Sequence, residues 1–428
     1  MSIKSGYKQT EIGIIPEDWE VVELDNILEK FQNGYAFSSE GYVETGVPII
    51  SMANISLKGT FQFDYEKAKY WAEEELDNLK QYQLEKGDLI IAMTDVTPDK
   101  KLIGRMAIVD KNDTFLLNQR VGLLKLKEVI NNKFLCEYGN FDIWRKYSKN
   151  VAALGAQANI STKDIKNGKI PLPPLEEQKK IADILSTVDK KIAFVEENIN
   201  ATEELKKGLM QKLLTEGIGH TEFKDSELGR IPESWKVVKL EEVCTKIVGG
   251  GTPSKNEPDY WNNGTIPWVT PSEFTKSKSN YISVTESKIS EEGLKNSSAT
   301  LLAIGTVIMS SRATIGECKI NTIEITTNQG FISFQCNDLL NNLYLVYFIK
   351  QNKPNILKIS SGSTFLEVSR TSMKNFSIAI PPLEEQKQIA EILSTVDKKL
   401  ENLKEKKQSF EELKKGLMQK LLTGEVRL

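Results

Sequence analysis

A long internal repeat constrains how this chain can fold more than any other feature. The segment PPLEEQKKIADILSTVDKK at 173–191 returns as PPLEEQKQIAEILSTVDKK at 381–399, an offset of 208 residues. At the same offset, ELKKGLMQKLLT at 204–215 recurs unchanged at 412–423. The chain is therefore expected to contain the same structural plan twice.

An earlier marker precedes each constant segment. IPEDW at 15–19 recurs as IPESW at 231–235, and a variable stretch lies between each marker and the constant segment that follows. The predicted division is a first variable domain at 1–172, a central constant helix at 173–218, a linker with the second variable domain at 219–380, and a C-terminal constant helix at 381–428.

The linker between the two halves resembles the chain ends joined together. LLTEGIGH at 213–220 corresponds to LLTGEVRL at 421–428, and ELGRIPESW at 227–235 corresponds to EIGIIPEDW at 11–19. This order is that of a ring cut at one linker. It predicts a pseudo-two-fold arrangement in which the N-terminal and C-terminal segments lie close together.

The constant segments have the pattern of long helices. A Pro-Pro pair suits the start of a helix, and Glu176 and Glu177 complement the positive end of its dipole. Apolar residues then alternate at steps of three and four, which is the spacing of a coiled-coil seam. The central residues of the predicted seam are Leu185, Val188, Ile192 and Val195 in the first helix and Leu393, Val396, Leu400 and Leu403 in the second.

The two constant helices are expected to pair with each other as an antiparallel coiled coil, because a continuous apolar stripe is unfavourable in water. Gly208 and Gly416 lie inside these helices, where each costs ~1 kcal/mol relative to alanine. Two interpretations stay open. Either the cost is tolerated, or each glycine marks a close backbone approach where two helices meet.

The variable domains have the pattern of short strands and turns. Apolar runs bounded by turn residues predict strands at 48–55, 88–93, 105–109 and 121–126 in the first domain and at 265–270, 306–311 and 330–336 in the second. One short helix is expected in each, over 134–148 and 342–353. Because glycines and an Asn-Gln pair recur at comparable places, we expect one α+β fold in both domains.

Composition and motifs argue against catalysis. The four cysteines lie far apart and there is one histidine, so we expect no metal site. GGGTPSK at 249–255 lacks the Gly-Lys-Ser/Thr ending of a Walker A loop, and no glycine-rich loop for a methyl donor or dinucleotide is present. We therefore expect no catalytic residues and no cofactor.

The chain has no segment that resembles a membrane span or a signal peptide. No apolar run approaches the ~18 residues of a transmembrane helix. The N-terminal sequence MSIKSGYKQTEIG also lacks the apolar core of a signal peptide. We expect a cytoplasmic protein that does not enter a membrane.

Polar loops beside the predicted strands hold the candidate binding residues. Asn, Gln, Arg, Lys and Ser side chains are those that pair with base edges and phosphates. The net charge of −3 gives no global sign of nucleic-acid binding, so the candidates are chosen from the local pattern of polar loop residues. The candidate DNA-contact residues are Lys100, Lys101, Arg105, Gln157, Asn159, Ser254, Lys255, Ser310 and Arg312.

Over its whole length the chain resembles the specificity subunit of type I restriction-modification systems. The paired I-P-x-x-W markers, the NGYAF and GGGTPSK openings of the variable domains and the doubled PPLEEQ helices carry the resemblance. It implies a non-catalytic subunit in which two target-recognition domains are separated by an antiparallel helix pair. Each domain would read one half of a bipartite double-stranded DNA target. The helices would dock two methyltransferase subunits, and restriction subunits would join them.

Two other interpretations remain open from the sequence. A coiled-coil scaffold for two copies of a protein would explain the helices but not the paired polar-loop domains. A nuclease centre would rest on Pro258-Asp259 with Glu286 and Lys288, a loose match to PD…ExK spacing. DNA binding by the purified chain, with and without methyltransferase partners, separates these interpretations.

If the constant helices set the distance between two half-sites, lengthening both should lengthen the unread gap. One added heptad preserves the seam and extends each helix by ~10 Å. This corresponds to about three base pairs, which also rotate one half-site by roughly 100° around the duplex. Either a longer spacer or a loss of activity is therefore expected, as read by sequencing the methylated motif. Full activity with an unchanged spacer would contradict the idea.

Overall fold

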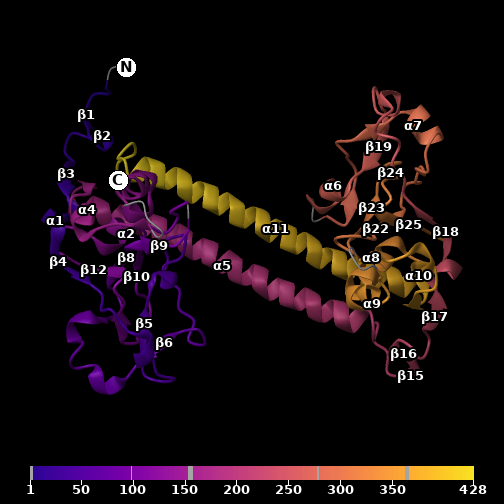
Figure 1. The fold of residues 1–428 in the computed structure, drawn as a ribbon, viewed down its shortest axis with the longest axis horizontal. Helices are drawn as coiled ribbons and strands as arrows, with labels where there is room; N and C mark the ends of the chain where they lie inside the picture. Colours follow the sequence, from indigo (N-terminus) through magenta and orange to yellow (C-terminus); the bar gives the residue numbers. More distant parts are fainter. Residues whose placement is uncertain (1–2, 98, 153–157, 277–278, 362–365) are drawn as a thin grey trace. The chain divides into compact units, whose positions relative to one another are not determined.

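The computed structural model describes residues 3–97, 99–152, 158–276, 279–361 and 366–428. The chain divides into two compact units: unit 1 comprises Met1–Glu196 and Glu405–Leu428, and unit 2 comprises Glu197–Lys404. Two helices of 39 residues, α5 (Leu175–Leu213) and α11 (Leu383–Leu421), each contribute one part to each unit (Figure 1). The predicted constant helices are confirmed.

Unit 1 contains two four-stranded sheets. The first has the order β10 (Met106–Ile108), β8 (Leu89–Ala92), β12 (Val121–Leu126), β4 (Leu28–Asn33). The second has the order β6 (Lys69–Trp71), β5 (Val47–Ile50), β11 (Phe115–Leu117), β7 (Gln83–Leu84). Strands β5 and β11 are parallel, and the other neighbours are antiparallel.

Smaller elements complete unit 1. Its two-stranded pairs are β1 (Tyr7–Thr10) with β2 (Gly13–Pro16), β3 (Glu20–Glu23) with β14 (Lys169–Leu172), and β9 (Thr94–Asp95) with β13 (Ala158–Asn159). Its short helices are α1 (Leu24–Ile27), α2 (Asn132–Asn140), α3 (Asp142–Val151) and α4 (Thr162–Lys166). The 3₁₀ turn η2 (Met52–Asn54) follows β5 directly.

Unit 2 repeats this plan. Its larger sheet has the order β18 (Cys244–Gly249), β25 (Phe331–Cys336), β22 (Val307–Ser310), β23 (Cys318–Asn321), β20 (Tyr281–Ile282), and its smaller sheet has the order β21 (Lys288–Ile289), β19 (Ile266–Val269), β24 (Thr326–Thr327). The remaining strands are β15 (Phe223–Ser226) with β16 (Gly229–Pro232) and β17 (Lys236–Lys239) with β26 (Ser377–Ile380). The short helices are α6 (Pro271–Lys276), α7 (Glu291–Lys295), α8 (Asn342–Gln351), α9 (Lys353–Lys358) and α10 (Arg370–Lys374).

Every predicted strand segment contains a strand, although β5 ends early and Met52–Asn54 forms the η2 turn instead. The short helix predicted at 342–353 is confirmed by α8, which α9 follows, whereas the single helix predicted at 134–148 is divided into α2 and α3. In unit 1 the Asn140 amide donates to the carbonyls of Cys136 and Met106, and α2 ends at Asn140. These tertiary hydrogen bonds are not visible in helical periodicity.

The ends of the constant helices lie in the domain cores. The core of unit 1 includes Ile181 and Leu185 from the start of α5 and Leu421 from the end of α11. The core of unit 2 includes Ile389 and Leu213 at the matching places. Each variable domain therefore folds around the beginning of one constant helix and the end of the other.

The I-P-x-x-W marker and the PPLEEQ segment are joined by one buried contact. The fully buried indole of Trp19 donates to the Glu177 carboxylate at 3.0 Å, and Trp235 donates to Glu385 at 3.1 Å. A buried carboxylate needs such donors, because an unpaired buried charge is strongly unfavourable. The two sequence markers are thus the two halves of one interaction.

The glutamine of PPLEEQ ties the start of α5 to helix α2. The Gln178 side chain donates to the carbonyls of Val129 and Pro173 and accepts the backbone N–H of Asn131, which caps α2. In unit 2 the fully buried Gln386 makes the same three bonds, to Leu339, Pro381 and Asn341. Three satisfied hydrogen bonds hold the amide in one orientation.

Within each unit, α5 and α11 pair antiparallel, as predicted. In the ion pairs between the two helices, the residue number rises along α5 as it falls along α11, which is the order of an antiparallel pair. They are Lys414–Asp189 and Lys407–Glu196 in unit 1 and Lys206–Asp397 and Lys404–Glu203 in unit 2. Of the seam residues, Leu185, Val188, Ile192, Val195, Leu393 and Leu400 are buried, and Val396 and Leu403 are half-buried.

The predicted proximity of the chain ends is also confirmed. The Tyr7 hydroxyl donates to the Gly424 carbonyl at 2.9 Å. The Arg427 guanidinium forms two 2.7 Å hydrogen bonds with Asp18 and contacts Glu177. In unit 2, where the chain runs through without a break, His220 contacts Glu385 at 2.8 Å in the corresponding position. A cationic or polar side chain therefore covers the same carboxylate in both units.

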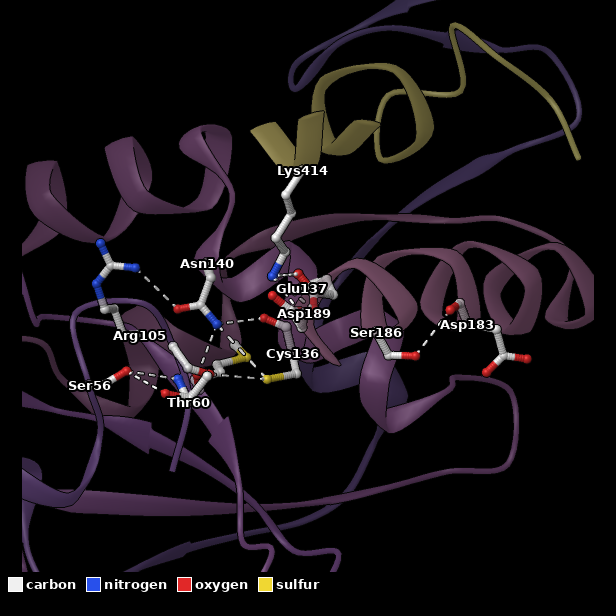
Figure 2. A network of polar contacts seen from close by, with 12 residues as sticks. Ser56, Thr60, Arg105, Cys136, Glu137, Asn140, Asp183, Ser186, Asp189 and Lys414 are labelled. Atoms are coloured by element: carbon white, nitrogen blue, oxygen red, sulfur yellow. Dashed lines mark hydrogen bonds and ion pairs between the residues drawn. The ribbon is translucent and has the colours of Figure 1, made fainter. Parts of the chain in front are cut away.

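A third side chain joins the helix ion pair of unit 1. Figure 2 shows Glu137 of α2 facing Lys414, with their charged atoms 3.0 Å apart, while Lys414 also contacts Asp189 at 2.6 Å. Two carboxylates thus share one ammonium group. Burial raises the pKa of Glu137 to about 7. In unit 2 the corresponding residue is Tyr347, whose hydroxyl donates to Asp397 at 2.7 Å.

We expect Glu137→Gln to change how stability depends on pH. The folded-state pKa of about 7 lies above the ordinary value of 4.5, so the folded state binds this proton more tightly. The stabilising effect is complete below pH ~4.5 and is lost as the pH rises to about 7. Between pH ~4.5 and about 7, the free energy of unfolding of the variant should rise relative to that of the wild type, as measured by denaturant unfolding. Tyr347→Phe is the matched control and should show no such shift; a constant Glu137→Gln difference would contradict the assignment.

Candidate nucleic-acid interface

Four chain segments meet at one edge of unit 1. The segment after β4 crosses the Asn118-Gln119 turn so closely that a Cβ on Gly34 would lie 2.1 Å from the Asn118 carbonyl oxygen. The Tyr35 N–H donates to Leu117 at 2.8 Å, and the Gln119 N–H donates to Tyr35 at 2.9 Å. The glycine of the NGYAF opening is therefore required by backbone contact.

The other two segments extend this edge. The Met93 N–H donates to the Arg120 carbonyl, and the Ile160 N–H donates to the Met93 carbonyl at 2.9 Å. Strands β9 and β13 pair there, with Asn159 opposite Thr94. The Thr162 hydroxyl closes the layer by donating to the Asn33 side chain at 3.0 Å. We call the layer formed by residues 33–35, 118–120, 93–95 and 158–162 the strand-end surface.

Unit 2 has a strand-end surface built in the same way. A Cβ on Gly250 would lie 1.9 Å from the Asn328 carbonyl oxygen, and the Thr252 hydroxyl contacts the Gln329 side chain. The Ser311 N–H donates to Gly330, and the Val368 N–H donates to Ser311. An isolated bridge pairs Arg312 with Glu367, at the place that Thr94 and Asn159 occupy in unit 1.

The loop between β9 and β10 in unit 1 is held by two buried charged residues. The Asp95 carboxylate accepts the backbone N–H groups of Thr97 and Leu102, and these hydrogen bonds hold its pKa below the ordinary value although burial acts in the opposite direction. The Arg145 guanidinium donates to the carbonyls of Lys101 and Ile103. Because its backbone is fixed in this way, the loop presents its side chains in a defined arrangement.

The predicted contact residues of unit 1 have different surroundings. Lys101 is exposed and pairs with Asp99 at 2.7 Å, and Asn159 is exposed on β13. Lys100 donates to the Lys149 and Ala152 carbonyls at the end of α3. Arg105 is half-buried and donates to the Lys101 carbonyl and, at 3.4 Å, to Asn140. Gln157 lies outside the described residues.

The predicted residues of unit 2 also differ in exposure. Ser254 and Lys255 are exposed in the GGGTPSK loop, where the Trp261 and Trp268 indoles donate to the carbonyls of Ser254 and Gly251. Arg312 is exposed and pairs with Glu367 at 2.9 Å. Ser310 is 2% exposed, and its hydroxyl donates to the Thr314 carbonyl at 2.5 Å. Its hydroxyl supports the turn in this structure.

The predicted Arg312 therefore stands at the place of Thr94 in unit 1, and the predicted Asn159 stands at the place of Glu367 in unit 2. The predicted set omitted the exposed Gln119 and Gln329, which occupy the matching turns. The signal for them was present, because Asn-Gln stands at comparable positions of both halves. Choosing among polar loop residues requires knowing which loops meet, and the linear sequence does not say so.

The features of the alternative interpretations take ordinary structural roles. Glu286 is exposed and pairs with Lys276 at 2.8 Å, and Lys288 is an exposed residue of β21. Within the described ranges there is no group of three or more His, Cys, Asp or Glu residues placed to hold a metal ion. Over the same ranges, no helix combines the length and apolar character needed to cross a membrane.

Two domains of one fold each have a polar strand-end surface and share two long helices. A family model described as the type I restriction modification DNA specificity domain matches residues 16–204 and 232–412. The chain belongs to this family. It is a non-catalytic DNA-recognition subunit that associates with methylase and restriction subunits, and the catalytic activities of such systems lie in those other subunits.

Individual proteins show the same similarity over their whole length. A putative type I restriction enzyme MjaX specificity subunit of Methanocaldococcus jannaschii is 32% identical, over 99% of this chain and 97% of that protein. The MjaVIII specificity subunit of the same organism is 28% identical, with 97% and 94% covered. A crystal structure of the type I restriction-modification S subunit from M. genitalium has a TM-score of 0.59 at 15% identity, with 98% of both chains covered. The expected α+β fold is confirmed.

Proposed function

We propose that each unit reads one half of a bipartite double-stranded DNA target through its strand-end surface. The observation that carries the proposal is that the same four segments meet at the same edge of both units, while the side chains they present differ. Unit 1 has Asn159 opposite Thr94, whereas unit 2 has Glu367 opposite Arg312 at the same two places. A shared framework with different donors and acceptors is what two different half-sites require.

The remaining predicted contact residues and the domain division belong to this proposal. Lys101, Ser254 and Lys255 are exposed beside the strand-end surfaces and suit phosphate or base contacts. We assign the recognition domains to 1–172 and 219–380 and the constant helices to 173–218 and 381–428. Because the ligand is DNA, we place the protein in the cytoplasm.

Substituting either exposed glutamine should relax the base specificity at one half-site. We expect Gln119→Ala to change the half read by unit 1 and Gln329→Ala to change the half read by unit 2. A lost bidentate base contact costs about 1–3 kcal/mol of discrimination. Sequencing of methylated sites in cells with the complete system measures the effect. Gln81→Ala, an exposed glutamine elsewhere in unit 1, is the control; an unchanged motif in both main variants would contradict the proposal.

We also propose which face of the constant helices docks a methyltransferase subunit. Residues 175–191 and 412–421 in unit 1 match 383–399 and 204–213 in unit 2 almost residue for residue. Of the twelve positions 192–203 between them, only Glu197 and Glu203 recur 208 residues later. Core packing needs no identity at exposed positions, so the recurring exposed residues fit a partner that binds each unit in the same way.

Gly208 and Gly416 support this choice of face. A Cβ added at either glycine would have no atom within 4 Å, so close helix approach within the chain does not explain them. An exposed leucine lies three residues before each glycine, Leu205 at 51% and Leu413 at 49% exposure. Gly416 also lines a largely apolar groove of about 1110 Å³ in unit 1. A flat notch beside an exposed leucine fits a closely packed partner helix.

Substitutions at Gly416 should separate folding from docking. Gly416→Ala should stabilise the free chain by up to ~1 kcal/mol, because alanine favours the helix and meets no neighbour. Gly416→Trp should keep the melting temperature near that of the wild type yet weaken binding of one methyltransferase subunit, measured by stoichiometry in native mass spectrometry. Gly208→Trp should do the same for the other. Full occupancy in both tryptophan variants would refute this docking face.

A further inference from the structure

A polar cleft in unit 1 lies at the carboxyl ends of two parallel strands. Strands β5 and β11 pair with Leu117 opposite Ile50, and the Asn118 N–H donates to the Ile50 carbonyl at 2.9 Å. Beyond this edge is a cleft of about 470 Å³ that includes Ser51 and Asn118 in its lining. Carboxyl ends of parallel strands are common ligand sites in sheets. Because Asn118 also belongs to the strand-end surface, the cleft adjoins the proposed DNA-reading edge.

In the part of the chain that the structure describes, one lysine that lines the cleft forms no ion pair with a carboxylate. Asp64 and Lys67 both line it and pair with each other at 2.9 Å. The ammonium group of Lys69 lies 5.2 Å from the centre of the Tyr42 ring, a contact that brings no opposite charge. Among the described residues, Lys69 has no salt bridge.

The amide side chains that could read a base are already engaged. The Asn54 amide donates to the Gln62 carbonyl at 3.1 Å, and its oxygen accepts the Ser51 N–H at 2.8 Å. The Gln62 amide donates to the Ala53 carbonyl at 2.9 Å. Bidentate base recognition needs both ends of an amide. What the cleft can offer is the ammonium of Lys69 and the NH₂ end of Asn118, whose oxygen accepts the Arg120 N–H.

Unit 2 shows what the same edge can hold. There Thr270 follows β19 as Ser51 follows β5, and Glu273 stands where unit 1 has Asn54. The Glu273 carboxylate accepts hydrogen bonds from the N–H and hydroxyl of Thr270 and from the N–H groups of Glu286 and Ser287. Unit 2 thus places an anion of its own at this edge, whereas unit 1 has a neutral amide and an open cleft.

We propose that the cleft at the carboxyl ends of β5 and β11 binds one backbone phosphate of the DNA held by unit 1, with Lys69 as its cationic ligand. This inference rests on the proposed reading of DNA by the strand-end surface and adds a contact that positions the duplex without reading its sequence. An ammonium beside an amide donor suits a phosphate, whose oxygens accept hydrogen bonds in any base context.

The test uses the full chain assembled with its methyltransferase subunits. Affinity for a duplex carrying the methylated motif and for an unrelated duplex is measured across a range of salt concentrations. Lys69→Ala should weaken both several-fold and lower the magnitude of the slope of log affinity against log salt by about one. Lys69→Arg should restore the slope. Lys80→Ala, an exposed lysine of unit 1 paired with Asp77, is the matched control and should leave it unchanged.

Two results would overturn the phosphate site. One is a salt slope for Lys69→Ala equal to that of the wild type, and the other is a changed methylated motif, which would mean that Lys69 reads a base. Failure of the proposed function looks different. An unaltered methylated motif in Gln119→Ala, together with the expected salt slope in Lys69→Ala, would contradict the proposed reading surface and support the phosphate site. Absence of DNA binding by the wild-type complex would overturn both.

Discussion

The structure depends on a buried hydrogen bond between a tryptophan at the start of each half and a glutamate at the start of a constant helix. Trp19 with Glu177 and Trp235 with Glu385 join parts of the chain that lie about 150 residues apart. The Glu177 carboxylate is buried and the Glu385 carboxylate is half-buried, and both would be unfavourable there without donors, so the helix start and the domain entrance must form together. Gln178 and Gln386 then fix the first short helix of each domain to the same point.

This shared framework leaves the loops free to differ. The glycines Gly34 and Gly250 bring the same backbone segments together in both units, because any side chain there would collide with a carbonyl oxygen. Once the backbone layer is formed, Asn159 and Glu367 can occupy matching places with different hydrogen-bonding chemistry, and so can Thr94 and Arg312. A shared framework with different side chains is also found away from this surface. Glu137 and Tyr347 stand beside equivalent lysine–aspartate pairs, yet one adds a carboxyl group and the other a hydroxyl.

Much of this fold could be predicted because its signals are local or repeated. The 3-4 spacing and the paired prolines locate the helices, and apolar runs locate strands such as β12, where prediction and structure share the bounds Val121–Leu126. The division of the short helix at Asn140 could not be predicted, because the Asn140 side chain donates a hydrogen bond to Met106 on strand β10, which is distant in the sequence. The two glycines inside the helices were equally ambiguous until their surroundings showed open space.

The sequence by itself determined the doubled plan, the helix seam, the closeness of the chain ends and the family, because each is encoded in spacing or in repeated residues. Tertiary structure alone decided which polar side chains meet at an edge. Lys100 and Lys101 are neighbours in the chain, but one caps the end of α3 and the other is exposed. Adjacent residues of a loop can point in opposite directions, and contacts made by distant segments fix that direction.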